Sequence, residues 1–507
     1  MTTAVGLSAQ GKVEQPARYE REKKFNDPDY NILSVEQDGL VLFRDNHKFG
    51  KIGQKLWEIV VLDTSLQEKF VMDLEMDSDR ELLGYEYGPG KFYMLFREGQ
   101  WSKSDWELVE LGLVDSAVSR YLIKNELEIE LSHFIISSST MVLGGSIQSK
   151  PTVLAYSLQT KKTEVLPGFY RKETRLVNLN RNVNGTFNVL LLEKGKVNES
   201  DILRLNVFSD NGDLLLQSAA VFDRETPVIS GVVSELKNDD LVILGSYGKR
   251  GTKTSRGLYF IKVKPGENND IKFTALSELS NFFRYMGPKR EARVLQKIKK
   301  AHPSQPWEYR GHLAIWDIHE KDNKYWLTGE VIDPQYSSSR NRLYSPYDYT
   351  NYGYGFYGTR YYRSFNSLYN STELISVKYR QGFYVGFDTN GKALWDASLP
   401  VDEIETSDIE QVSAFGSKGD KYQIIYRHEE DGLYYTSGST DNISRADSLI
   451  TIRLKDPSDE LKTETQKSGK VEWWFDNVFF AWGFQRIHNK INDQRRHVFY
   501  INKICIE

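Results

Sequence analysis

One segment of this 507-residue chain, residues 334–371, gathers the residue types that most readily bind another molecule. Tyrosine offers a large, rigid surface with a hydrogen-bonding hydroxyl, and tyrosine and arginine together dominate the energetic centres of protein interfaces. Asp348 is the only acid among them. We therefore predict a binding loop in this segment. Its candidate partner-binding residues are Arg340, Arg342, Tyr344, Tyr347, Tyr349, Tyr352, Tyr354, Tyr357, Arg360, Tyr361, Tyr362 and Arg363.

The Tyr/Arg loop, as we call residues 334–371, follows neither a helical nor a strand period. Long loops inside compact domains are usually functional or disordered. Disordered segments are normally poor in aromatic residues, and this favours a binding role. A protein or a glycan partner suits the chemistry. Single-stranded nucleic acid also suits it, because bases stack on aromatics and arginines hold phosphates. A flexible low-complexity loop is the alternative.

A second basic segment, residues 277–306, interrupts the surrounding strand pattern. Pro288 suits the first turn of a helix, where its missing N–H is harmless. Val294, Leu295 and Ile298 then fall on one face, and cations occupy the rest. Such a helix could dock an acidic partner, a membrane surface or nucleic acid. It could also simply pack against the domain with solvated cations, and the frequency of basic amphipathic helices favours this reading. The candidate partner-binding residues of the helix are Lys289, Arg290, Arg293 and Lys297.

Signatures of catalysis and metal binding are missing from the sequence. It contains no Gly-x-x-x-x-Gly-Lys-Ser/Thr, His-Glu-x-x-His or Gly-x-Ser-x-Gly motif. The lone Cys505 excludes a disulfide framework and a cysteine-based metal site within the chain. His312 and His319, with Asp317 between them, alternate awkwardly for one metal, so we interpret them as structural. The acids at 429–431 precede Gly432 and indicate a hairpin turn. We therefore expect no catalytic residue, no metal and no cofactor.

The elements that must position these residues are short β-strands. From Tyr30 onward, apolar runs of about 4–8 residues alternate with Gly, Asn, Asp and Ser, which is the pattern of strands and turns. A strand–turn–strand unit recurs, most clearly at 208–214 and 387–395, where Asn-Gly marks a tight hairpin. The strand ends at Tyr156, Phe208 and Val263 follow one another at intervals of about 50 residues, which is near the length of a four-stranded propeller blade. We predict an all-β fold, a single β-propeller of about seven four-stranded blades. A pair of β-sandwich domains is the alternative.

The unit at 387–395 carries a more specific pattern, Asp388, Gly391, Lys392 and Trp395 in an Asp-x-x-Gly-Lys-x-x-Trp arrangement. This pattern resembles the repeat of quinoprotein-type propellers. The repeat length also resembles that of WD-repeat proteins, although the Gly-His and Trp-Asp signatures are not periodic here. The resemblance covers one good repeat, so it supports the fold and not quinone chemistry.

The domain organisation follows from this pattern. Residues 1–29 read as a signal remnant followed by an extended charged arm, and residues 30–507 as the propeller, with a helical insertion at 277–306 and a loop insertion at 334–371. The strongly β run at 497–506 is expected to close the ring beside the first strands, near Tyr30–Val35.

The N-terminal residues and the overall charge of the chain indicate where in the cell the protein acts and what it binds. Residues Ala4–Gln10 resemble the end of a signal peptide cut after an alanine, which favours export to a bacterial envelope, in the periplasm or at the outer membrane or cell surface. If residues 1–9 are not such a remnant, the protein is cytoplasmic. No apolar run is long enough to span a bilayer. Lys and Arg number 66 against 70 Asp and Glu, which disfavours a protein whose whole surface grips nucleic acid.

Taken together, these features predict a non-catalytic protein-interaction scaffold, a subunit of a bacterial cell-envelope complex that binds other envelope proteins through its loops. The alternative is a carbohydrate-active enzyme or glycan-binding protein that uses the axial cleft of the propeller. Two acids about 5–10 Å apart across a cleft would suit that chemistry, and the tyrosines would stack on sugars. Nucleic-acid binding is the least favoured reading, because the chain is acidic overall.

Overall fold

The structure is a computed structural model. It describes residues 12–24, 27–50, 53–99, 104–169, 173–196, 199–237, 240–252, 254–266, 269–302, 307–321, 323–336, 360–361, 374–402, 404–428 and 432–507. No helix in these ranges is both long enough and apolar enough to cross a membrane.

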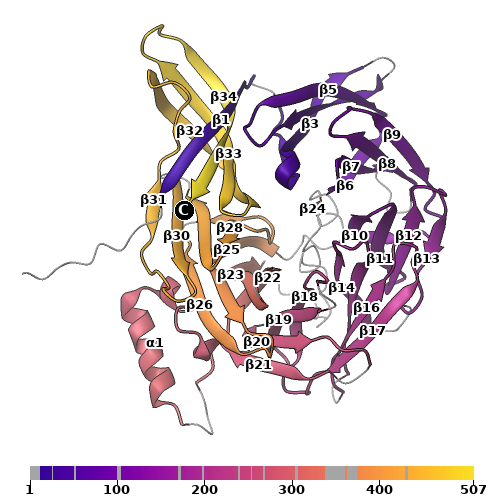
Figure 1. The fold of residues 1–507 in the computed structure, drawn as a ribbon, viewed down its shortest axis with the longest axis vertical. Coiled ribbons are helices and arrows are strands. Elements are labelled where there is room, and N and C mark those ends of the chain that lie inside the picture. The colour runs from indigo at the N-terminus through magenta and orange to yellow at the C-terminus, as the bar shows by residue number, and fades with distance from the viewer. Residues whose placement is uncertain are drawn as a thin grey trace, which may run out of the picture.

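Eight antiparallel sheets stand side by side as the blades of a ring (Figure 1), and each is given below from its innermost to its outermost strand. Blades 1 and 2 contain β2 (Asn31–Ser34), β3 (Leu40–Phe49), β4 (Lys55–Leu62) and β5 (Glu68–Met76), then β6 (Arg80–Gly88), β7 (Lys91–Glu98), β8 (Trp106–Gly112) and β9 (Val118–Ile123). Blades 3 and 4 contain β10 (Glu130–Ser137), β11 (Thr140–Ile147), β12 (Lys150–Ser157) and β13 (Thr163–Val165), then β14 (Thr174–Arg181), β15 (Phe187–Glu193), β16 (Ile202–Phe208) and β17 (Leu214–Val221).

The second half of the ring repeats this order. Blades 5 and 6 contain β18 (Val228–Val233), β19 (Val242–Gly248), β20 (Ser255–Lys262) and β21 (Ile271–Ala275), then β22 (His312–Lys321), β23 (Lys324–Tyr336), β25 (Leu374–Phe387) and β26 (Ala393–Pro400), with β27 (Glu405–Thr406) also paired to β25. Blades 7 and 8 contain β28 (Ser413–Lys418), β29 (Lys421–His428), β30 (Gly432–Ser439) and β31 (Ser448–Ile450), then β32 (Asp459–Phe475), β33 (Val478–Asn489), β34 (Arg495–Ile506) and β1 (Val13–Glu22).

The predicted all-β propeller of four-stranded blades is confirmed, but it has eight blades rather than about seven. Blade 8 is hard to recognise in the sequence because it joins the two ends of the chain. The hairpin between its first two strands turns at Asp476 and Asn477, with no glycine to mark it.

The ring is closed by β1, a strand whose many charged residues do not show the usual apolar pattern of a strand. β34 pairs with β1, with Tyr19 opposite Ile501, and not with the segment near Tyr30–Val35 as expected. Charged side chains of β1 find partners on both sides of the seam. Arg18 lies 2.6 Å from Glu20 within the strand, and Arg21 bonds to Glu58 of β4 in blade 1. The charged arm at 13–22 is therefore the outermost strand of blade 8.

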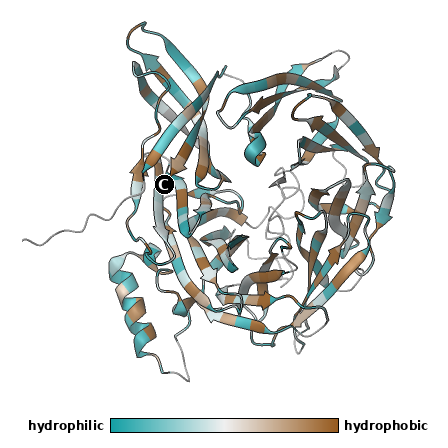
Figure 2. Cartoon of the chain, viewed as in Figure 1, coloured by the Kyte–Doolittle hydropathy of each residue, from teal (hydrophilic) through white to brown (hydrophobic). Residues whose placement is uncertain are grey.

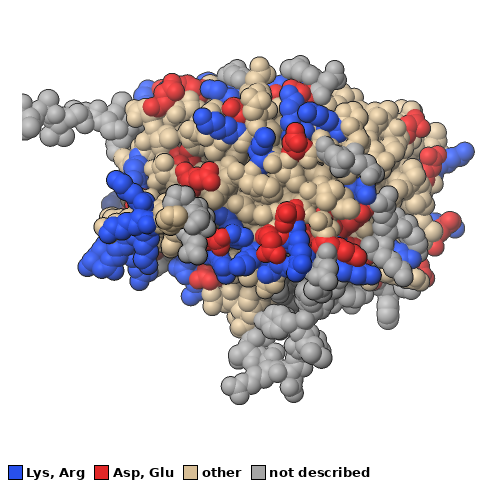
Figure 3. All heavy atoms as spheres, turned by 90° about the horizontal axis from the view of Figure 1, so that it is seen from below, with Lys and Arg blue, Asp and Glu red and all other residues tan. Residues whose placement is uncertain are grey.

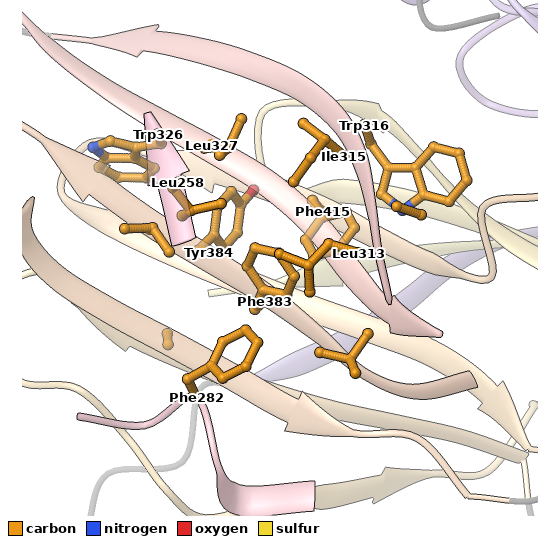
Figure 4. Close-up of a cluster of buried hydrophobic side chains, with 14 of the residues drawn as sticks. Leu258, Phe282, Leu313, Ile315, Trp316, Trp326, Leu327, Phe383, Tyr384 and Phe415 are labelled. Carbon is orange, nitrogen blue, oxygen red and sulfur yellow. The ribbon is translucent and has the colours of Figure 1, made fainter. Parts of the chain in front are cut away.

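Apolar side chains between neighbouring blades form the core, as the hydrophobic bands along the strands in Figure 2 show. The largest cluster joins blades 5, 6 and 7 and includes Phe282, Phe383, Tyr384 and Phe415 (Figure 4). Trp395 of β26 stacks on Tyr422 of β29, with ring centroids 5.3 Å apart. The tryptophan of the Asp-x-x-Gly-Lys-x-x-Trp pattern thus joins blade 6 to blade 7.

One helical insertion lies outside the ring. The connection from blade 5 to blade 6 forms two short 3-10 turns, η3 (Leu276–Glu278) and η4 (Arg284–Met286), and then α1 (Pro288–Lys300). α1 stands at the rim beside the outer strands of blades 6 and 7 (Figure 1). Blade 1 carries a third such turn, η1 (Glu36–Asp38), directly after β2.

Candidate functional sites at the rim and on the axis

Most of the Tyr/Arg loop lies outside the described residues, so the structure does not test its candidate residues. The backbone of Arg360 and Tyr361 is described and forms β24. This short strand pairs with β6, Arg360 opposite Tyr85 and Tyr361 opposite Gly84. β6 is the innermost strand of blade 2, whereas the loop leaves and rejoins blade 6 on the opposite side of the ring. The pairing therefore brings part of the insertion across the ring. The acids at 429–431 also lie outside the described residues.

The structure brings the candidate residues of the helix together on one exposed surface. The side chains that share it point into solvent from successive turns of α1, and they form the concentration of Lys and Arg at one edge of the molecule in Figure 3. Among described residues, none of them has an ion-pair partner. We call this surface the cationic face of α1, and it consists of Lys289, Arg290, Arg293, Lys297, Lys299 and Lys300.

The opposite face of α1 is fixed to the propeller. Val294 and Ile298 pack against the core cluster of blades 5 to 7. Glu291, which is 8% exposed, forms an ion pair with Arg445 of the connection between β30 and β31. Leu295, expected on the apolar face, is 37% exposed and instead borders the cationic face. The single acid of the helix is thus occupied internally, and the helix cannot use it to neutralise its own cations.

The segment before α1 is anchored as well. Asp396 of β26 accepts hydrogen bonds from the backbone N–H groups of Ser280 and Asn281, at 2.8 and 2.7 Å. Arg284 in η4 forms a 2.8 Å ion pair with Asp447 of blade 7 and also donates to the backbone carbonyl of Ser398. These contacts hold the base of the insertion, so the cations are presented from a rigid support.

A different group of charges lies on the innermost strands of the ring or in the segments that directly follow these strands. Its members come from blades 1, 2, 4, 5 and 6, and they interact across blade boundaries. We call this group the axial cluster. It consists of Glu36, Tyr87, Arg181, Glu235, Asp317 and His319.

A β-bulge aims Asp317 at the axial cluster. The pairing of β22 with β23 shifts between Ile315 and Ile318, so that Trp316 and Asp317 together oppose Thr328. The Thr328 hydroxyl accepts a hydrogen bond from the Asp317 N–H at 3.0 Å and so replaces the lost ladder bond. Bulges of this kind redirect side chains and are frequent beside functional sites. From the sequence we interpret His312 and His319 as structural, and the sequence carries no mark of the bulge that places Asp317 beside the other charges.

Two carboxyls of the axial cluster, Asp317 and Glu235, have a pKa above the ordinary value. The Asp317 side chain reaches solvent, yet protein surrounds it, and this desolvation raises its pKa against the opposing effect of His319. Desolvation and the neighbouring Asp317 raise the pKa of Glu235, and Arg181 opposes them. Desolvation lowers the pKa of His319, although Asp317 works in the other direction. The cluster therefore contains two carboxyls with a raised pKa and an imidazole with a lowered pKa.

Arg181 is the cation at the centre of this cluster. Its guanidinium donates to the backbone carbonyl of Tyr87 and lies 4.4 Å from the centre of the Tyr87 ring. Desolvation works against its charge, but Glu86 and Tyr87 lead the interactions that raise the pKa of Arg181 overall. The Tyr87 hydroxyl in turn donates to Glu36. One arginine from blade 4 thus links acidic groups of blades 1, 2 and 5.

Aromatic rings line one side of the cluster. The His319 ring lies 5.7 Å from Trp473 of β32 and 6.2 Å from Tyr384, both in edge-to-face orientation. Trp473 is half-buried, and its indole N–H donates to the Asp476 carbonyl at 2.8 Å. Carboxyls, an imidazole and an aromatic surface are the groups that proton transfer and ring stacking require.

The likeness of this chain to known proteins is limited to its fold. No protein-family model and no curated protein matches the chain. Solved structures that match include "Crystal structure of polysaccharide lyase Uly1", with 8% identity, a TM-score of 0.36, and 84% of this chain and 90% of that one covered. The β-propeller domain of the Trilobed protease from Pyrococcus furiosus matches with 8% identity, a TM-score of 0.35, and 83% and 93% coverage. Prolyl oligopeptidase B from Galerina marginata matches with 6% identity and a TM-score of 0.41, and the chain spans 56% of its length. The chain is a β-propeller by its own strand order.

Proposed function

We propose that this protein is a non-catalytic interaction scaffold that docks an acidic partner protein on the cationic face of α1. The carrying observation is that six cations stand on a rigidly anchored helix without an ion-pair partner among the described residues. A helix that only covered its domain would gain from neutralising such charges at close range. Like charges held together raise the local potential and steer an oppositely charged partner.

The location of this scaffold is part of the proposal. The Ala4–Gln10 pattern supports a role in a bacterial envelope complex, with other envelope proteins as partners. Mass spectrometry of the protein isolated from its native cells tests this. A mature chain that begins at Gln10 supports export, and one that retains Met1 contradicts it.

Site-specific photo-crosslinking tests the docking surface. A photoreactive residue at Gln296, which is exposed on α1, should crosslink to a discrete acidic protein in the native cell. The same residue at Thr160, exposed in a turn of blade 3, is the matched control and should not crosslink to that protein.

Charge reversal then tests the mechanism. The variant K289E/R290E/R293E/K297E should lose the crosslinked partner at least tenfold, because four exposed pairs of up to about 1 kcal/mol each are replaced by repulsions. The variant K124E/K161E/K162E/K324E changes the net charge equally on other exposed turns and should retain it. Equal retention by both variants would show that α1 is not the docking element.

The axial cluster supports a second candidate function, carbohydrate binding or turnover at the axis. The supporting observation is that Asp317 and Glu235, two carboxyls with raised pKa, interact with each other, while the half-buried Trp473 contacts His319. A screen of oligosaccharides tests it. Turnover that is abolished by D317N or E235Q, with the fold intact, would favour this function over the scaffold.

A further inference from the structure

We propose that the outer edge of blade 5 binds an extended acidic peptide, which adds to β21 as a fifth strand. The site is a groove between β21 and the turn that precedes β26 in blade 6, and it encloses about 430 Å³. This inference deepens the proposed function by naming the form in which an acidic partner binds. The inference rests on the proposed function only for the acidity of the partner, because no residue of α1 lines the groove.

The lining residues show that the groove follows the edge of the strand. Lys272, Phe273 and Thr274 of β21 line it in succession, opposite residues 390–393. Successive side chains of a strand point to opposite faces of its sheet. Lys272 and Thr274 therefore share the face of blade 5 that is turned to blade 6, and Phe273 between them lines the groove with its backbone.

The backbone of β21 offers this edge an unused donor and acceptor. β21 pairs with β20 on its inner side and is the last strand of its sheet. The N–H of Ala275 donates to Glu278 Oε1 at 3.3 Å, so Ala275 points its backbone groups away from β20. Backbone groups alternate between the two edges of an antiparallel strand. Phe273, two residues earlier, therefore directs its N–H and C=O into the groove.

Glu278 shows which chemistry the edge accepts. Its carboxylate accepts from the last outward N–H of β21, that of Ala275, in the position that a neighbouring strand or an acidic side chain would take. Exposed strand edges pair readily with other chains unless they are covered or charged. Among the described residues, the one side chain that hydrogen-bonds to the outer edge of β21 is this carboxylate, at the end of the strand.

The side chains of the groove match an acidic, partly apolar peptide. Lys272 on one wall and Lys392 on the other are both exposed, and neither pairs with an acid among the described residues. Phe273 is 41% exposed, and its ring is held edge-on against Tyr247 with centroids 4.8 Å apart. The lysines lie on the blade 6 side of the edge and the Phe273 ring lies on the other side, against Tyr247 and Phe222. The edge therefore suits a strand that alternates carboxylates with apolar side chains.

The second wall is rigid. The Asp388 carboxylate accepts hydrogen bonds from the N–H groups of Asn390 and Lys392, at 2.8 and 2.9 Å. Gly391 has φ of +80° and lies so close to Phe260 of blade 5 that a Cβ there would stand 2.5 Å from the ring. Only glycine fits, and the turn is thereby pressed against blade 5. A preformed wall lowers the ordering cost of binding.

A peptide fits this groove better than an acidic sugar does. Strand addition uses main-chain hydrogen bonds for affinity and side-chain pockets for specificity. Phe273 presents a donor and an acceptor at the spacing of one peptide unit, and the lysines contact the alternate side chains. An acidic oligosaccharide would use only the lysines.

Binding of a defined peptide tests the inference. The probe is a fluorescein-labelled, end-capped hexapeptide of alternating Asp and Val, titrated by fluorescence anisotropy. It should bind the wild-type protein, and hydrogen exchange of the segment 271–275 should slow in its presence. The same hexapeptide with N-methyl groups on its three Val residues, and a second one with them on its three Asp residues, shows whether main-chain pairing is used. One of the two should bind at least tenfold more weakly than the parent.

Variants of the protein provide the matched comparison. F273P removes the outward N–H and should reduce binding at least tenfold, while the fold is kept because proline is tolerated where an edge N–H faces outward. F273A keeps the N–H and should retain binding within about fivefold. K272Q and K392Q should each weaken binding by up to about fivefold, as expected for exposed ion pairs.

Three results would overturn the inference. They are equal binding of both N-methylated peptides and the parent, unchanged binding to F273P, and complete displacement of the hexapeptide by an acidic oligosaccharide that itself slows no exchange in 271–275. Failure of the proposed function is distinguishable, because K289E/R290E/R293E/K297E leaves the groove intact and should bind the hexapeptide as the wild type does.

Discussion

The rim and the axis of this propeller handle charge in opposite ways. On α1 the cations are exposed and lack ion-pair partners among the described residues, whereas the one acid is buried against Arg445. In the axial cluster the charges interact across blades, and desolvation together with these interactions shifts the pKa values of Arg181, Glu235, Asp317 and His319. Exposed, unpaired charge costs the fold little and remains available to a partner. Desolvated charge is coupled to the stability of the blades that carry it.

The comparison predicts its largest effect for two arginines. R181A removes the cation that links blades 2 and 4 and leaves carboxyls of several blades uncompensated, so we expect a loss of about 2–4 kcal/mol in the free energy of unfolding. R293A on α1 should change it by less than about 0.5 kcal/mol. Urea unfolding followed by tryptophan fluorescence measures both. Similar losses in the two variants would abolish the distinction between rim and axis.

The anchor of α1 should show a smaller effect that stays local. E291Q removes the charge that pairs with Arg445, and we expect a cost of about 1–2 kcal/mol. Because α1 is an insertion, the cost should appear as faster hydrogen exchange within 284–300 and not across the blades. An E291Q protein with wild-type exchange in this segment would mean that the apolar contacts alone hold the helix.

The smallest effect concerns pH at the axis. The folded pKa of Glu235 is raised above its ordinary value of 4.5, so the folded state binds this proton more tightly than the unfolded state. The resulting stability is complete below pH 4.5 and is lost as the pH rises through the folded pKa. Because the Glu235 side chain is exposed, solvent screens its interactions, and E235Q should be more stable than the wild type at pH 8 by less than about 1 kcal/mol. R293Q, at the rim, should follow the wild-type curve. Urea unfolding at pH 5 and pH 8 makes the comparison.

The sequence was sufficient for the fold class and for the basic helix. Repeating turn signals predict the propeller, because each blade must reverse its chain at the same places, and Pro288 with the spacing of Val294 and Ile298 predicts α1. The prediction that Leu295 lies on the apolar face of the helix is wrong, because the helical period does not show how wide the face in contact with the propeller is. The strand at 13–22 was read as an arm, since its charges are neutralised by residues such as Glu58 that are remote in sequence.

The candidate sites were only partly predictable, for a physical reason. A patch of cations is local in sequence, and so the cationic face of α1 could be recognised. The axial cluster is assembled from five blades and depends on a bulge at Trp316 and Asp317, which has no mark in the sequence. Most residues of the Tyr/Arg loop lie outside the described ranges, and its role as a binding loop stays a prediction.

The pairing of β1 with β34 has a consequence for the order of folding. The outermost strand of blade 8 precedes blades 1 to 7 in the sequence, whereas its partner follows them. Blades 1 to 7 can form in sequence from neighbouring segments, but the ring cannot close until Arg495–Ile506 has emerged. Closure over so long a segment is entropically costly and late, and until then β1 has an exposed, unpaired edge. A chain that stalls or is truncated before residue 495 would therefore remain an open arc.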